Sequence, residues 1–61
     1  MEFKENLKQL RLQKGLTQAQ LAEKLFVSRS TVAKWENGLG LPNPESMATL
    51  EKLFDIVAEE L

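Results

Sequence analysis

Residues 16–42 read LTQAQLAEKLFVSRSTVAKWENGLGLP, and this stretch decides the fold. It contains two short helical patterns, over about residues 18–25 and 29–36, with only a few residues between them. Thr17 and Gln20 have the spacing of a capping box, and Ser28 is the expected N-cap of the second helix. Two short helices joined in this way predict a helix-turn-helix, whose second helix lies in the DNA major groove.

The chain on either side of this stretch predicts further helices. Residues 3–14 carry apolar side chains at helical spacing, and Asn43 is the expected N-cap of a helix that runs to about Phe54. Residues 56–61 predict a turn and the start of a fifth helix. The expected fold is therefore all-α, a compact bundle of about five short helices that forms a single domain over residues 1–61.

Composition limits the possible functions. The 61 residues include no Cys and no His, which excludes disulfides and the common zinc sites, and we expect no cofactor. No apolar run approaches the ~18 residues of a membrane span, and no signal peptide opens the chain, so a cytoplasmic domain with no membrane partner is expected. The chain also lacks Tyr and a Gly-rich phosphate loop, which argues against an enzyme.

The net charge of −1 is unevenly distributed. Residues 1–44 carry seven Lys or Arg against four Glu, a net +3, whereas residues 45–61 carry one Lys against five acids, a net −4. The positive part contains the helix expected over residues 29–36, which we call the reading helix because it is the one expected to contact DNA bases. We therefore expect the acidic end to face away from DNA.

The helix over residues 29–36 separates into two faces. Val32 and Trp35 fall on the side that faces the core, and the opposite side is short and polar. Arg29 lies in the first turn, where its guanidinium can bind guanine O6 and N7 together, a contact worth roughly 1–3 kcal/mol of discrimination. The expected DNA base contacts are Arg29, Ser30, Ala33 and Lys34.

In these residues the chain resembles the phage-repressor/Cro-type (Xre-family) helix-turn-helix domain, which is lambda-repressor-like in fold. The resemblance implies that Gln18 grips a DNA phosphate at the amide-rich start of its helix, and that Asn37 makes another such contact. It also implies a partly buried ion pair between Arg11 and Glu36 that orients the reading helix. The full set of expected phosphate contacts is Thr17, Gln18, Ser28, Thr31 and Asn37.

The chain departs from the family pattern in two places. The loop after Gly38 reads Leu-Gly-Leu where many relatives carry Lys or Arg, so phosphate contacts are lost there. Val57 stands where relatives often have a Ser or Thr cap, so the last helix is poorly started.

The function expected from these patterns is sequence-specific binding of double-stranded DNA by a bacterial or phage transcriptional regulator that acts as a repressor. One reading helix covers few base pairs, so we expect a homodimer on a pseudo-palindromic operator, paired through residues 53–61. No small-molecule ligand is expected. The alternative is a helical protein-interaction module, antitoxin-like or bridging-factor-like, which the loop residues Leu39 and Leu41 favour.

Overall fold

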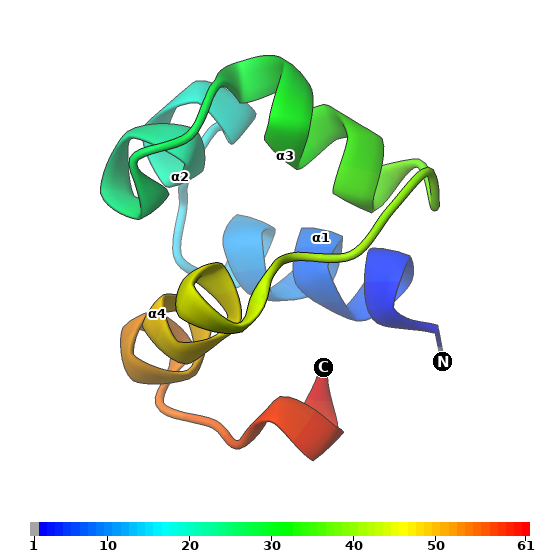
Figure 1. Ribbon diagram of the computed structural model, residues 1–61. Coiled ribbons are helices and arrows are strands. Elements are labelled where there is room, and N and C mark those ends of the chain that lie inside the picture. The colour runs from blue at the N-terminus through cyan, green and yellow to red at the C-terminus, as the bar shows by residue number, and fades with distance from the viewer. Residues whose placement is uncertain (1) are drawn as a thin grey trace.

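A computed structural model describes residues 2–61, which form four α-helices followed by one 3-10 turn (Figure 1). The all-α prediction is confirmed. The elements are α1 (Phe3–Gln13), α2 (Gln18–Leu25), α3 (Arg29–Glu36), α4 (Pro44–Phe54) and η1 (Ala58–Glu60).

The helix boundaries follow from local cap chemistry. Thr17 Oγ1 accepts a hydrogen bond from the Gln20 backbone N–H at 3.0 Å, and Gln20 Oε1 accepts one from the Thr17 N–H at 2.8 Å. This reciprocal capping box satisfies donors that an uncapped helix start would leave without partners. Ser28 and Asn43 cap α3 and α4 with one bond each, because their side-chain oxygens accept from the N–H groups of Thr31 and Ser46. The helix starts expected from the sequence are therefore confirmed.

The start of a fifth α-helix, predicted after α4, is not formed. The segment after α4 forms only the three-residue 3-10 turn η1. Its N-cap is Val57, whose side chain has no oxygen to accept a backbone hydrogen bond. The Ala58 N–H donates instead to Glu51 Oε2 at 2.8 Å, from the last part of α4. The first helix is also one residue shorter than expected, because Lys14 is its C-cap and Gly15 follows with a φ of 70°.

The core lies between α1, α2, α3 and α4. Figure 1 shows α2 and α3 together at one end of the molecule, α4 and η1 at the other, and α1 between them. Each α-helix contributes apolar side chains to one buried cluster: Leu7, Leu21, Ala22, Leu25, Val32, Trp35, Leu50 and Phe54. In the described residues, no helix is both long and apolar enough to cross a membrane.

Two features of the surface were not expected from the amphipathic pattern. Phe26, the residue that ends α2, has a left-handed backbone with a φ of 59° and a side chain that is 93% exposed. By contrast Leu53, Ile56 and Leu61, which we expected at a dimer surface, pack in part against the core. Val57 is the large apolar residue of this segment that stays exposed.

Candidate nucleic-acid interface

A buried ion pair joins α1 to the end of α3. Arg11 donates through Nε to Glu36 Oε2 at 2.7 Å and through Nη2 to Glu36 Oε1 at 3.1 Å. The two side chains are only 9% and 3% exposed. A third bond, from Arg11 Nη1 to the Leu16 carbonyl at 2.8 Å, ties the same guanidinium to the segment between α1 and α2. The pair implied by the family resemblance is thus present, and it is bidentate, the strongest geometry for such a contact.

Gln18 connects this ion pair to Arg29. The Gln18 amide nitrogen donates to Glu36 Oε1 at 3.2 Å, and the amide oxygen accepts from Arg29 Nη1 at 3.1 Å. Because a carboxylate only accepts and a guanidinium only donates, these two partners fix which way round the amide lies. The Arg29 guanidinium is therefore held against α2 through one of its five N–H donors, which leaves the others for a ligand.

The outer face of α3 is exposed and polar. Arg29, Ser30 and Lys34 are exposed and Ala33 is half-buried, while Val32 and Trp35 are buried on the inner face. The four residues expected to contact bases thus share one accessible face of a single helix. Their common position is the geometric requirement for reading a groove.

A cluster of hydroxyl groups marks the start of α3. The Ser28 hydroxyl lies 3.0 Å from that of Ser30 and 2.8 Å from that of Thr31, and it also accepts the Thr31 backbone N–H at 3.2 Å. Ser28, Ser30 and Thr31 are therefore brought together. Their hydroxyls constrain each other, so an incoming base or phosphate must compete with bonds that already exist.

The remaining expected phosphate contacts lie at two separate places. Thr17 and Gln18 form the start of α2, where the first-turn N–H groups of a helix have no intrahelical acceptors and favour an anion. Asn37 is exposed at the C-cap of α3, at the other end of the reading helix. The expected phosphate contacts therefore lie at the starts of α2 and α3 and just beyond the end of α3.

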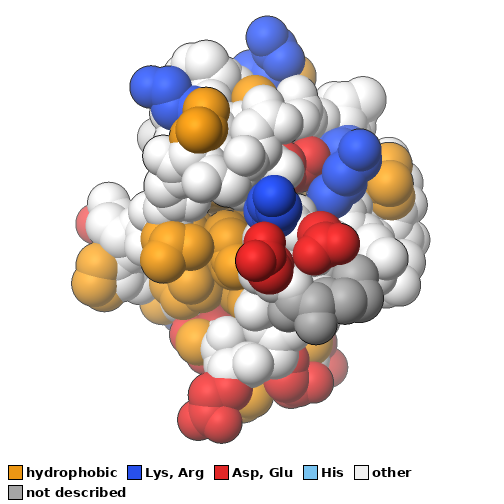
Figure 2. Space-filling view, turned by 90° about the vertical axis from the view of Figure 1, so that its right-hand side faces the viewer, with side chains coloured by type: hydrophobic (Ala, Val, Ile, Leu, Met, Phe, Trp, Pro, Cys, Tyr) orange, Lys and Arg blue, Asp and Glu red, His pale blue; other side chains and the backbone are white. Residues whose placement is uncertain are grey.

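The charge distribution separates the two ends of the molecule. In Figure 2, Lys and Arg side chains lie over the upper half, which contains α2 and α3, whereas Asp and Glu side chains lie both in the middle of this face, beside Lys or Arg, and at the lower end. Apolar side chains form a patch between them. The face that carries Arg29 and Lys34 is thus the one suited to a polyanion.

Comparison with known proteins decides the family. Residues 7–61 match the model of the family described as "Helix-turn-helix". The chain belongs to the helix-turn-helix family. Over all 61 of its residues this helix-turn-helix chain is 54% identical to the HTH-type transcriptional activator BcrR of Enterococcus faecalis, of which it spans 30%.

Two further relatives are less similar. One is the cryptic phage CTXphi transcriptional repressor RstR of Vibrio cholerae, 34% identical over 61 residues, and the other is the uncharacterized HTH-type transcriptional regulator YqaE of Bacillus subtilis, 34% identical over 59 residues. The helix-turn-helix chain spans 54% of the first and 51% of the second, and 100% and 97% of its own residues are matched. It thus corresponds to part of each of these relatives.

Sequence reasoning missed two side-chain contacts in this helix-turn-helix chain. The first is the bridge from Glu36 through Gln18, because Gln18 was expected to contact a phosphate, with bracing of Arg29 only as the alternative. The second is Lys4, whose side chain lies against Gly38. Nothing in the spacing of these residues signals either contact, since both depend on how the helices pack.

Proposed function

We propose that this chain binds double-stranded DNA in a sequence-specific manner, as the DNA-reading domain of a transcriptional regulator. Helix α3 lies in the major groove, where its exposed face meets the base edges. The observation that carries this proposal is the hydrogen-bonded position of Arg29, held by Gln18 at the start of that face. A guanidinium that is already placed loses less conformational freedom when it binds guanine.

The other contacts divide by role. Ser30, Ala33 and Lys34 follow Arg29 along the outer face and complete the base-reading set. Phosphate contacts come from the two flanks, and they fix the register of the domain on the duplex without reading sequence. They are Thr17, Gln18, Ser28, Thr31 and Asn37.

We further propose that the protein acts as a homodimer on a pseudo-palindromic operator. Two-fold pairing places the reading helices about 34 Å apart on one face of the DNA, and it doubles the number of bases read. The site of action is the cytoplasm, where the DNA of a bacterial or phage regulator is found. One relative of this domain is named as an activator and another as a repressor. This supports the view that residues outside the domain determine whether transcription is activated or repressed.

The test is selection of bound duplexes from a random pool, followed by the same selection with Arg29→Ala. The wild-type protein should recover a consensus with two related half-sites. Arg29→Ala should lose roughly 1–3 kcal/mol of specific binding and relax the preference at one base in each half-site. An unchanged consensus and unchanged affinity would remove Arg29 from the base-reading set, and no consensus from the wild type would contradict the function.

A second candidate, a protein-interaction module, is favoured by the loop after α3. Leu39 and Leu41 are 73% and 72% exposed there, beside a cavity of about 320 Å³ lined by Phe3 and Trp35 among others. A salt titration separates the two functions. DNA binding weakens linearly in the logarithm of salt concentration, whereas docking of an apolar partner has no such counterion term.

A further inference from the structure

Three basic residues form a stripe on α1. Lys4, Lys8 and Arg11 are four and three positions apart, so they lie on one face of the helix. Arg11 is seated on Glu36, the last residue of α3. At the other end of the stripe, Lys4 lies against Gly38, just beyond α3: a Cβ placed on Gly38 would lie 3.1 Å from Lys4 Cδ. Both ends of the stripe therefore face the C-terminal end of α3, and Lys8 lies between them.

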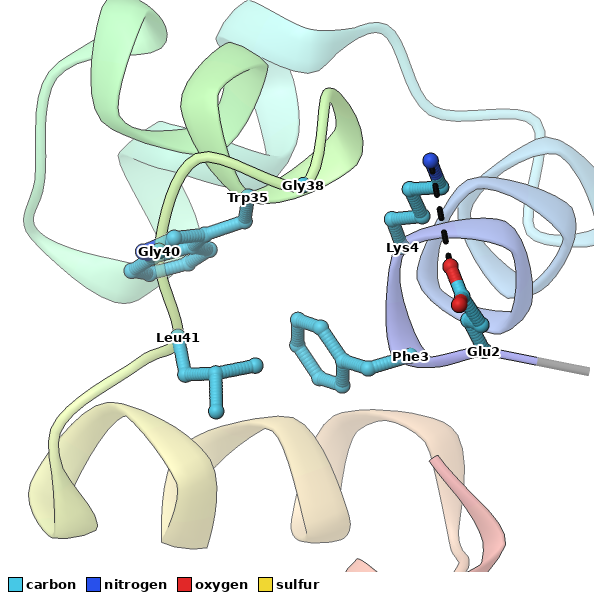
Figure 3. Close-up of a pocket in the computed structure, with 7 residues that line it drawn as sticks. All are labelled: Glu2, Phe3, Lys4, Trp35, Gly38, Gly40 and Leu41. Atoms are coloured by element: carbon cyan, nitrogen blue, oxygen red, sulfur yellow. Dashed lines mark ion pairs between the residues drawn. The ribbon is translucent and has the colours of Figure 1, made fainter.

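The side chain of Lys4 packs beside the loop at Gly38: a Cβ placed on Gly38 would lie 3.1 Å from its Cδ and 3.6 Å from its Nζ. Lys4 contributes to the wall of the cavity that Phe3 and Trp35 also line. Figure 3 shows the side chain rising from α1 beside the loop at Gly38, with its ammonium group at the far end. The Lys4 side chain as a whole is 42% exposed, so it stays accessible to a ligand beside this contact.

The partner of Lys4 is easily displaced. Lys4 Nζ lies 3.8 Å from Glu2 Oε2, and the Glu2 side chain is 75% exposed. An exposed ion pair at this separation contributes little, with a median of about 0–1 kcal/mol. A phosphate group can therefore replace Glu2 at small cost.

The loop beyond α3 supplies no cation of its own. Residues 38–42 read Gly-Leu-Gly-Leu-Pro and contain no Lys or Arg. Lys4 is placed beside the end of α3 by its contact with Gly38, Arg11 is paired with Glu36, and Lys8 lies between these two on the same face of α1. A DNA backbone that passes the end of the reading helix meets the α1 stripe where the loop is uncharged.

We propose that Lys4 and Lys8 bind DNA phosphates beside the C-terminal end of α3, in place of cations in the loop. The partner is duplex DNA, so this inference rests on the proposed function. It adds a phosphate site on α1 to those proposed at the starts of α2 and α3 and at Asn37. Such contacts set affinity and salt dependence and leave base preference unchanged.

The test compares Lys4→Gln and Lys8→Gln with Lys52→Gln, a matched control on α4. Lys52 is also exposed and the substitution removes the same charge, but it lies in the acidic part of the chain. Affinity is measured by fluorescence anisotropy on the selected operator and on a scrambled duplex over a range of salt concentrations. Each α1 substitution should weaken both duplexes about eightfold at about 0.1 M salt, because one phosphate contact contributes about 0.9 to the logarithmic salt slope.

Two further variants test whether the effect is specific to the α1 lysines. Lys52→Gln should leave the salt slope nearly unchanged, and Glu2→Gln should strengthen binding because it removes the competitor for Lys4. Salt slopes for Lys4→Gln and Lys8→Gln equal to that of Lys52→Gln would overturn the inference while the proposed function stands. A wild-type protein that shows no salt-dependent binding to either duplex would instead contradict the proposed function. Urea unfolding of each variant establishes that the protein measured is folded.

Discussion

The strongest prediction concerns the substitution Arg11→Met. Methionine fills much of the space of the arginine stem, so the main loss is of three hydrogen bonds, two to Glu36 and one to the Leu16 carbonyl. The Glu36 side chain is 3% exposed in the described structure. Without Arg11, its carboxylate keeps only the Gln18 amide among the partners that the structure describes. Removing one partner of a buried ion pair costs about 3–5 kcal/mol. A domain of this size is stable by only about 3–9 kcal/mol, so the loss is about a third of its stability or more.

The double variant Arg11→Met with Glu36→Leu should recover much of that loss. Two apolar side chains of similar volume can replace a buried pair at little or no cost, because no charge is then left without a partner. A double-mutant cycle should give a coupling free energy at the upper end of the usual range of about 0.5–3 kcal/mol. The four proteins are compared by urea unfolding in a stabilising osmolyte such as sucrose, so that the weakest variant still has a folded baseline.

DNA binding by the same four proteins separates stability from positioning. In the double variant Gln18 loses its Glu36 acceptor, so its amide is free to turn and no longer holds Arg29 in one place. We therefore expect operator affinity to stay below that of the wild type even where stability is recovered. Coupling near zero would show that Arg11 and Glu36 act independently. Full operator affinity in the double variant would refute the argument that the ion pair positions Arg29.

Two further predictions concern single residues. Gln18→Ala should weaken binding to the operator more than to a scrambled duplex, because it releases Arg29 as well as a phosphate contact; equal losses on both duplexes, measured by anisotropy, would assign Gln18 to phosphate alone. Phe26→Gly should raise the free energy of unfolding by about 0.5–1 kcal/mol, because glycine adopts the left-handed backbone at this position without the strain of a Cβ. A loss of stability in urea unfolding would show that the exposed ring packs on the fold after all.

The parts of the fold that sequence predicts are those governed by neighbouring residues. The capping box of Thr17 and Gln20, the Asn43 cap and the left-handed Gly15 each depend on chemistry within a few positions, and all are present. The buried faces of the helices follow from helical spacing for the same reason. After α4 the N-cap position is Val57, which makes no side-chain cap bond, and only the three-residue turn η1 forms.

Contacts between helices were less predictable because spacing along one helix does not say which residue of another it meets. The family resemblance implied the pairing of Arg11 with Glu36, but the bridge from Glu36 through Gln18 to Arg29 required the packing of three helices. The apolar residues after α4 illustrate the same point. They suggested a dimer surface, yet Ile56 is used in part to cover the domain's own core.

The hydrogen bonds of Gln18 also connect a local cap to the side chain that we propose reads a base. Gln18 contacts Glu36 at the end of α3 and Arg29 at its start, so one side chain of α2 is bonded to both ends of the reading helix. Gln18 is the first helical residue after Thr17, so the position of Gln18 depends on the capping box. A buried ion pair adds little stability over an apolar pair. Its value here is that it orients the Gln18 amide, and with it the guanidinium of Arg29, before any DNA is bound.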